Sequence, residues 1–345
     1  MIPAPKFVLS KSRLFEQYKI LEDLGLGISY SVKTNPTVAC VLEENRDCFF
    51  SVHTKQELDF IRDKTRIWFL AESWNKQEIQ QLINKGIKNF IIYNVNDLNT
   101  LTDFLEKNPI KINLLLRVKL RENTIFTERY FVFGLDAKTL NIQIHKLRKN
   151  KNIEKLGLHF HRKTQNVSEW ALKYELNNIL EPRTMEETDI VNIGGGLPVR
   201  YRNTGDDALS HIFKKIKELK VWLEEHNIQM IIEPGRFLSG PSIKLEAYVT
   251  NVVGNTITVN CSVYNSSMDT LVVPIKLLVE GELPEKKGKK YTIKGCTPCS
   301  MDIFRYSVNL PEKKPGDKIV FLNAGAYNFH TDFCSLEKIE TEIVD

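Results

Sequence analysis

Short apolar runs rich in β-branched residues alternate with amphipathic stretches over the first two thirds of the chain. The amphipathic stretches, among them 55–63, 75–86 and 209–227, space their apolar residues three or four positions apart and so predict helices with one buried face. The apolar runs number eight and begin at Gly27, Cys48, Arg66, Asn89, Ile112, Lys155, Ile190 and Met230. Eight alternating strand–helix units predict a (β/α)8 barrel. The same alternation also fits an open, doubly wound sheet, because a sequence does not show whether a sheet closes.

The pattern changes after Glu233. Strand-like runs now follow one another, separated by Gly, Asn and Pro-Gly turns, with little helical spacing between them. They cover residues 244–254, 255–264, 270–280, 289–295, 317–325 and 337–345. We therefore expect a barrel over residues 10–235 and a mostly β domain over residues 236–345. A short strand-like run precedes the first barrel helix, and we expect residues 1–9 to join the β domain.

Unusual residues fall where the predicted barrel strands end. Barrel active sites are built at the C-terminal ends of the strands. Six landmarks lie at these ends: Lys33, His53, Arg117, His161, the triplet Gly194–Gly196, and Glu233. Each is ordinary by itself, since a lone histidine is more often a satisfied structural residue and a glycine triplet is more often a tight turn. Their convergence on one rim indicates a functional site.

The chemistry of these landmarks points to a cofactor. Lys33 stands in "YSVKTNP", at the end of the first strand, where we expect it to be buried. Because a charged ammonium is costly to desolvate, such a lysine is typical of an amine that must be neutral to form an imine with a carbonyl. The glycine triplet would let backbone N–H groups approach a phosphate, and Glu233 would keep a pyridine nitrogen protonated. Together these groups predict pyridoxal phosphate.

The composition is that of an ordinary globular protein, with 26% charged and 42% hydrophobic residues among 345. The net charge of +5 is spread among comparable numbers of acids, so we expect no nucleic-acid binding. No apolar run reaches membrane-spanning length, and the first residues are too few and too charged for a signal peptide, so we expect no membrane partner. Six cysteines do not make a disulfide scaffold, and a reducing cytoplasm is the expected location.

Several segments resemble one known family, in that family's order. They are "YSVKTNP" at 30–36, "GLHFHRKTQ" at 157–165, "NIGGGLP" at 192–198, "EPGRFLSGPS" at 233–242, "GCTPCSMDIF" at 295–304 and "NAGAYNF" at 323–329. With these motifs the chain resembles the pyridoxal-phosphate decarboxylases of the alanine-racemase fold. This group holds the ornithine, diaminopimelate, arginine and carboxynorspermidine decarboxylases. The resemblance spans nearly the whole chain and implies a barrel followed by a β domain.

The resemblance also implies roles for single residues. Lys33 would bind the cofactor's aldehyde, Glu233 would pair with the pyridine nitrogen, and His161 would stack on the ring. Matching "HRKTQ" to the family's pattern selects His161 over His159, although strand alternation places both on one face. The remaining residues implied in cofactor binding are Thr164, Gly195, Gly196, Gly235, Arg236 and Tyr327.

Relatives act as head-to-tail dimers in which a cysteine segment reaches the neighbour's site, and the resemblance implies the same homodimer here. Cys299 is the better match for the family's cysteine, the proton donor to the carbon that loses CO2, but Cys296 stays an alternative. "CSMD" has one residue fewer between cysteine and aspartate than is common in relatives. The Cys296–Cys299 spacing also has a metal or redox interpretation, yet no second pair completes a zinc site, so we predict no metal.

These features predict a decarboxylase of a basic amino acid of the ornithine or lysine type. Cys261 or its neighbours occupy the position that matches the acid holding the distal amine in relatives, and Asp269 or Asp302 could substitute for that acid. Residues 262–271 have some similarity to carboxynorspermidine decarboxylases, and Arg305 could serve the second carboxylate of diaminopimelate. Two other functions compete. The cysteine segment disfavours an amino-acid racemase, which needs a tyrosine base, and the β domain disfavours a pyridoxal-phosphate carrier without turnover.

Overall fold

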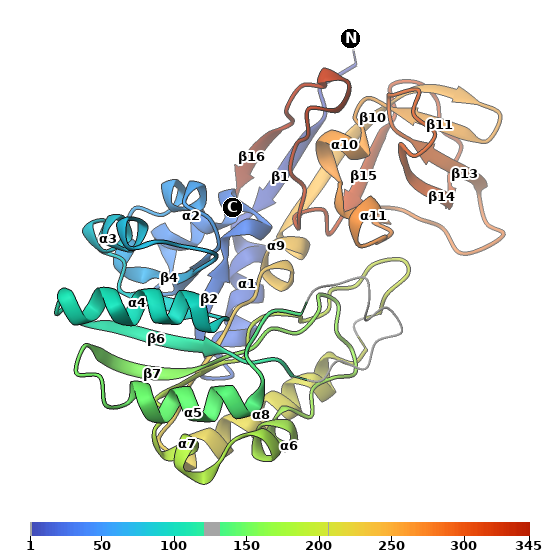
Figure 1. Ribbon diagram of the computed structural model, residues 1–345. Coiled ribbons are helices and arrows are strands. Elements are labelled where there is room, and N and C mark those ends of the chain that lie inside the picture. Colours follow the sequence, from blue (N-terminus) through green and yellow to red (C-terminus); the bar gives the residue numbers. More distant parts are fainter. Residues whose placement is uncertain (1, 121–131, 206) are drawn as a thin grey trace. The chain divides into compact units, whose positions relative to one another are not determined.

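The computed structural model describes residues 2–120, 132–205 and 207–345, and the chain divides into two compact units (Figure 1). The barrel unit consists of Leu21–Leu197 and Asp207–Pro234. The β unit consists of Met1–Ile20, Pro198–Asp206 and Gly235–Asp345. This division places residues 10–20, 198–206 and 235 in the β unit, whereas the sequence pattern assigned them to the barrel.

Eight parallel strands form a closed barrel, which confirms the predicted (β/α)8 architecture and excludes the open sheet. The strands are β2 (Gly27–Ser31), β3 (Phe49–Val52), β4 (Ile67–Leu70), β5 (Asn89–Ile92), β6 (Ile112–Arg117), β7 (Ile153–His159), β8 (Ile190–Asn192) and β9 (Gln229–Ile232). Each overlaps one of the eight predicted runs. The ring closes where β2 pairs with β9, with Gly27 opposite Ile231 and Ile28 opposite Ile232.

Helices and short 3-10 turns connect the barrel strands. They are η1 (Val32–Thr34), α2 (Pro36–Asn45), η2 (Gln56–Phe60), η3 (Lys64–Arg66), α3 (Lys76–Asn84), α4 (Val95–Lys107), α5 (Ala137–Leu147), α6 (Leu172–Ile179), α7 (Pro182–Glu186) and α8 (Leu209–Glu225). The helix predicted over 55–63 is wrong, because only the 3-10 turn η2 forms there. Across the described residues, no helix combines the length and the apolar character that crossing a membrane requires.

Local sequence fixes where these helices begin. The side chain of Asn75 accepts a hydrogen bond from the backbone N–H of Glu78, and Glu78 returns one to Asn75, so a capping box starts α3. Asn35 caps α2 by accepting from the N–H of Val38, and Pro36 occupies the first helical position. The N-cap residue of α2 therefore follows Lys33 by two positions.

Apolar side chains fill the interior of the barrel. Trp68, Ile91, Leu115, Ile190 and Ile231 form one buried cluster and come from five different strands. Their burial removes apolar surface from water around the whole ring, which is the main force that holds a barrel together. The strand ends carry the polar residues described below.

The β unit is built on a twisted sheet whose strands are β1 (Lys6–Ser10), β10 (Ile243–Val253), β11 (Thr256–Val259), β12 (Leu278–Val279), β13 (Lys289–Lys294), β14 (Ile303–Leu310), β15 (Lys318–Leu322) and β16 (Glu340–Val344). Its main path runs β12-β15-β10-β11-β13-β14. β1 pairs antiparallel with β10 and parallel with β16, so the N-terminal strand joins this sheet as predicted. The helices α1 (Lys11–Glu22) and α9 (Arg236–Ser242) adjoin it in sequence.

Two runs predicted as strands are each only partly extended and also contain a helical turn. Within 255–264 only β11 is extended, and α10 (Val263–Ser266) follows because Ser262 and Asn265 form a capping box. Within 270–280 the chain forms α11 (Asp269–Val272), and only the two residues of β12 pair with β15. Apolar β-branched residues favoured strands at both places, but at α10 the capping box decided the conformation.

Candidate active site

A buried carboxylate, that of Glu233, is the centre of the polar residues at the strand ends of the barrel. Its Oε1 accepts hydrogen bonds from Ser51 Oγ and Asn192 Nδ2, both at 2.8 Å, and its Oε2 lies 3.2 Å from His159 Nε2. Burial alone would raise the pKa of Glu233, but His159 and the hydrogen bond from Ser51 outweigh it and hold the pKa well below its usual range. Glu233 is therefore an anion, as the sequence analysis expected.

His161 lies beside this carboxylate and is neutral. Its Nδ1 accepts a hydrogen bond of 3.1 Å from the backbone N–H of Gly195, so the proton of the neutral ring belongs on Nε2. Burial, and then the positive charges of Lys33 and Arg117, lower the pKa of His161 well below its usual value. The ring is thus held in one orientation without carrying charge.

The glycine triplet packs against the protein's own backbone. A Cβ on Gly194, whose φ is +64°, would lie 2.2 Å from the carbonyl oxygen of Phe160, and one on Gly195 would lie 2.7 Å from that of Glu233. Gly196 has φ of +109°, a conformation that side chains other than glycine rarely adopt. These positions require glycine because the loop lies directly against the strand ends.

The triplet also differs in detail from the predicted phosphate cradle. The N–H of Gly195 donates to His161, so it is engaged within the protein. The N–H of Gly196 has no hydrogen-bond partner among residues 2–120, 132–205 and 207–345, while its carbonyl accepts from the N–H of Asn166 at 2.9 Å. Of the two predicted donors, Gly196 is the one open to an anion. Thr164 lies in the segment that packs against Gly196 through the carbonyl of Lys163.

Lys33 lies beyond the strand rather than in it. Strand β2 ends at Ser31, and Lys33 lies in η1, where it is exposed while Val32 and Thr34 are buried, so the expectation of a buried lysine is wrong. The surrounding protein nevertheless reduces the hydration of the amine, and this lowers the pKa of Lys33 below its usual value. The charge of Glu233 opposes this shift, and that of Arg117 adds to it.

The structure therefore brings the landmarks of the barrel rim together. Lys33 and Arg117 act electrostatically on His161, and Lys33 also lowers the pKa of His53, after the larger effect of burial. The carboxylate of Glu57 also lies at this end of the barrel, where it accepts a hydrogen bond of 3.0 Å from the backbone N–H of His53. Polar and charged groups that come from the ends of several different strands are the arrangement expected of a barrel active site.

One nitrogen or oxygen atom from each of His159, His161 and Glu233 lies within 4.8 Å of the others, which is a grouping that could hold a metal ion. Two features disfavour this use. His159 Nε2 is engaged with Glu233, and His161 Nδ1 is engaged with Gly195.

In the β unit, the buried Arg236 pairs with Asp269. Its Nη2 donates to Asp269 Oδ1 at 3.1 Å, its Nη1 donates to the other carboxylate oxygen, and Nη1 also donates to the hydroxyl of Tyr201 at 3.0 Å. The guanidinium lies over the ring of Tyr327, 5.3 Å from its centre. Asp269 is therefore bound to an arginine rather than open to the amine of a substrate. Gly235 precedes Arg236 and starts α9.

Asp302 organises the segment that carries Cys299. Its Oδ1 accepts from the backbone N–H of Val263 at 2.9 Å, and its Oδ2 accepts from the N–H and hydroxyl of Thr297 at 3.0 and 2.7 Å. The residue is fully buried and both carboxylate oxygens are occupied by protein donors, so Asp302 stabilises this segment and is not open to the amine of a substrate. Cys261 is also buried, and this burial raises the pKa of its thiol well above the usual value.

The two cysteines of "CTPC" differ in acidity. The hydroxyl of Tyr264 lies 3.2 Å from Cys299 Sγ, and this hydrogen bond lowers the pKa of Cys299. Burial raises the pKa of Cys296. Cys299 is accordingly the more acidic thiol.

Two further arginines are paired within the protein. Arg162 is buried against Glu175 of α6 and Glu169. Arg305 is buried and donates to both carboxylate oxygens of Glu282, at 2.8 and 3.0 Å. Arg305 is therefore not available for the second carboxylate of diaminopimelate.

Ser51 and Asn192 belong to the candidate site, although the sequence analysis did not single them out. Both are small polar residues on barrel strands, and both point their side chains at Glu233. A signal did exist for Asn192, which directly precedes the "IGGG" segment and whose Oδ1 accepts the N–H of Gly194 at 2.9 Å. Ser51 has no such sequence neighbour, and only barrel closure brings it to Glu233.

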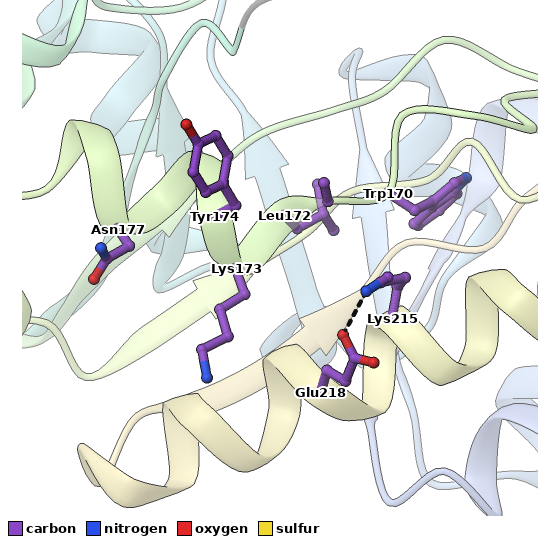
Figure 2. Close-up of a pocket in the computed structure, with 8 residues that line it drawn as sticks. Trp170, Leu172, Lys173, Tyr174, Asn177, Lys215 and Glu218 are labelled. Atoms are coloured by element: carbon purple, nitrogen blue, oxygen red, sulfur yellow. Dashed lines mark hydrogen bonds and ion pairs between the residues drawn. The ribbon is translucent and has the colours of Figure 1, made fainter.

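A pocket of about 360 Å³ lies on the outer helices of the barrel unit, between α6 and α8 (Figure 2). Its lining includes Trp170, Leu172, Tyr174 and the ion pair of Lys215 with Glu218, 2.8 Å long. None of the predicted site residues lines this pocket. The carboxylate in its lining, Glu218, is paired with Lys215, and none of the landmarks of the barrel rim lies there, so the strand ends remain the candidate site.

Comparison with known proteins agrees with this geometry. A family model described as pyridoxal-dependent decarboxylase, pyridoxal binding domain, matches residues 13–240. A diaminopimelate decarboxylase of Methanothermobacter thermautotrophicus is 22% identical over 94% of this chain and 82% of its own length. A probable ornithine decarboxylase of Dictyostelium discoideum is 23% identical over 86% of this chain and 69% of its own length.

Among solved structures, a lysine/ornithine decarboxylase of Vibrio vulnificus complexed with putrescine has the same fold. Its TM-score is 0.82 at 20% identity, and the match covers 99% of this chain and 94% of that one. The family model spans both the lysine segment and the Glu233 segment, well over half of the chain. The chain therefore belongs to the pyridoxal-dependent decarboxylases.

Proposed function

We propose that this protein removes the α-carboxylate of a basic amino acid of the ornithine or lysine type, and that pyridoxal phosphate binds at the strand ends around Glu233. The observation that carries the proposal is the state of this carboxylate. It is buried, ionised and already accepts three hydrogen bonds from Ser51, Asn192 and His159. A carboxylate offers about four lone pairs, so one position on Oε2 is left for a further donor.

The residues around Glu233 fit this cofactor. A protonated pyridine nitrogen would be the fourth donor, and the negative charge of Glu233 would keep the proton on that nitrogen. The neutral ring of His161, fixed by Gly195, supplies a flat aromatic face beside it. The N–H of Gly196 and the hydroxyl of Thr164 are proposed ligands of the phosphate, in the loop position that barrels often use for this anion.

The cofactor, when bound, supplies an electron sink that stabilises the carbon left when CO2 departs. Lys33 provides the amine that binds the cofactor's aldehyde, and its lowered pKa leaves more of this amine neutral at a given pH. Cys299 is the proposed proton donor to the α-carbon. In the β unit, the proposed phosphate ligands by family resemblance are Gly235, Arg236 and Tyr327. The guanidinium of Arg236 lies over the ring of Tyr327 and so helps to position it.

The choice of substrate rests on the relatives. Proteins similar to this chain are named diaminopimelate and ornithine decarboxylases, and solved structures of the same fold include lysine/ornithine enzymes. We favour a substrate without a second carboxylate because the candidate arginine for that group, Arg305, is paired with Glu282. Diaminopimelate is the alternative, since several relatives carry that name. Asp269, Asp302 and Cys261 have other contacts, and we do not assign the distal amine to them.

We further propose that two copies form a homodimer in which Cys299 serves the site of the partner. Relatives with this cysteine segment share their sites in this way. The lowered pKa of Cys299, together with the raised pKa of Cys296, supports Cys299 as the thiol concerned.

Borohydride reduction tests the attachment of the cofactor. The purified protein loaded with pyridoxal phosphate should absorb visible light, and reduction followed by peptide mapping should find the cofactor on Lys33, because its neutral amine is the proposed partner of the aldehyde. Lys55, which pairs with Glu78 on the surface, is the matched control. Covalently trapped cofactor in Lys33→Ala at the level of the parent would refute the assignment.

Replacing Glu233 with Gln tests the charge at the ring nitrogen. Turnover should fall on the order of a hundredfold or more, because the neutral amide no longer holds a proton there. Cofactor content should persist, since the glycine loop is unchanged. The control is Glu224→Gln on the exposed side of α8. Unchanged kcat in Glu233→Gln, with the cofactor bound, would contradict the proposal.

Mixing inactive chains tests the shared site. Lys33→Ala and Cys299→Ala chains should each be inactive, and their co-expression should restore roughly a quarter of the parental activity, because half of the dimers are mixed and each carries one intact site. Cys296→Ala should stay active by itself. If both single variants are inactive and dimeric yet the mixture gains nothing, the partner does not supply Cys299.

A further inference from the structure

The side chain that contacts the thiol of Cys299 has no role in the function proposed above. Tyr264 lies on the short helix α10, and its hydroxyl is 3.2 Å from Cys299 Sγ, within hydrogen-bond distance when sulfur is one of the atoms. Cys299 itself is on a separate segment, 35 residues later in the chain. Because neither residue is a sequence neighbour of the other, the fold must bring the two groups together.

One buried carboxylate fixes both segments. Asp302 accepts the N–H of Val263, which starts α10 immediately before Tyr264. The same Asp302 accepts from Thr297 on the other side and donates its own N–H to the carbonyl of Cys299 at 3.1 Å. Gly295 completes the arrangement, because a Cβ there would meet Asp302 Oδ1 at 2.1 Å. The relative positions of the hydroxyl and the thiol therefore depend on one fully buried group.

The ring of Tyr264 is held independently of this hydrogen bond. It stacks on Phe333, with ring centres 4.0 Å apart and an interplanar angle of 30°. Its backbone carbonyl accepts from the N–H and the hydroxyl of Thr331, at 3.1 and 2.8 Å. A ring fixed in this way points its hydroxyl at one place without losing rotamer freedom when the bond to sulfur forms.

We propose that Tyr264 is a positioning residue for Cys299: its hydroxyl donates to the sulfur, holds the thiol in one orientation and stabilises the thiolate. This inference rests on the proposed role of Cys299 as the proton donor. In that step the S–H bond breaks, the proton passes to the α-carbon of the product, and the negative charge stays on the sulfur. A donor aimed at the sulfur stabilises that charge and makes the thiol a better general acid near neutral pH.

The neighbouring groups act in the directions that this bond requires. The hydrogen bond from Tyr264 is the largest influence that lowers the pKa of Cys299, the N–H of Met301 adds to it, and the charge of Asp302 opposes it. Reciprocally, the bond to Cys299 raises the pKa of Tyr264 to about 12, and Asp302 and Cys334 add to that rise. Both shifts are those of a phenol that donates to a thiolate.

Alkylation of single cysteines tests the proposal without any turnover. The loaded parent, Tyr264→Phe and Tyr306→Phe would be treated with iodoacetamide at several pH values, and the labelled peptides counted by mass spectrometry. Tyr306 is an exposed tyrosine of the same unit and serves as the matched control. Cys296 in the same samples is the internal reference.

In Tyr264→Phe, which keeps the ring and its stacking, the alkylation rate of Cys299 at about pH 7.5 should fall roughly three- to tenfold, and its pH midpoint should rise. Tyr306→Phe should change neither value, and Cys296 should be alkylated alike in all three proteins. An unchanged rate and midpoint for Cys299 in Tyr264→Phe would overturn the proposal.

A reciprocal measurement decides the matter if Tyr264→Phe does not fold. The tyrosine rings of the parent and of Cys299→Ala can be titrated by NMR with carbon-labelled tyrosine. One ring should titrate at a lower pH in Cys299→Ala than in the parent, because it has lost the thiolate that it solvates. If every tyrosine titrates alike in the two proteins, the pair does not interact. The inference and the proposed function can fail separately. If the pH midpoint of Cys299 alkylation rises in Tyr264→Phe but Lys33 binds no cofactor, this inference stands while the proposed function fails.

Discussion

The rest of the site depends on a buried anion that three strands hold in place. Glu233 follows β9, Ser51 belongs to β3, and His159 and Asn192 end β7 and β8. Bringing a carboxylate out of water is unfavourable unless its lone pairs are satisfied, so these donors must meet at one point. Only a closed ring of strands gives them that meeting point. The barrel thus keeps a negative charge at the place where we propose that the cofactor's ring nitrogen binds.

Much of this fold could be predicted from the spacing of apolar residues and from the turn residues between the apolar runs. Eight apolar runs that alternate with helical patterns predicted the barrel, and the landmarks at their ends predicted its rim, because strand direction alone decides which ends of parallel strands share a face. Short helical turns could not be predicted in this way. Ser262 and Asn265 start α10 within a run of β-branched residues, so the hydrogen bonds of a capping box overruled strand propensity there. The turn at Val32–Thr34 leaves Lys33 exposed just after its strand.

Charged side chains were the hardest to assign. Arg162, Arg236 and Arg305 each reach a distant acid, Glu175, Asp269 and Glu282. A long guanidinium side chain finds its partner through the tertiary fold, and sequence spacing gives no indication of it. Residues that a family pattern offers as substrate ligands can therefore be occupied within the protein. The same reasoning explains why Ser51, which has nothing unusual beside it in the sequence, was missed.

The most direct test of the account is the fate of the α-carboxylate. The loaded protein would be given ornithine, lysine, diaminopimelate and, as neutral and acidic controls, alanine and glutamate, each labelled in that carboxylate and at the α-hydrogen. The account predicts that labelled CO2 is released in equal amount to a diamine from ornithine or lysine, and not from the controls. Exchange of the α-hydrogen without loss of CO2, or no release from any basic amino acid, would contradict it.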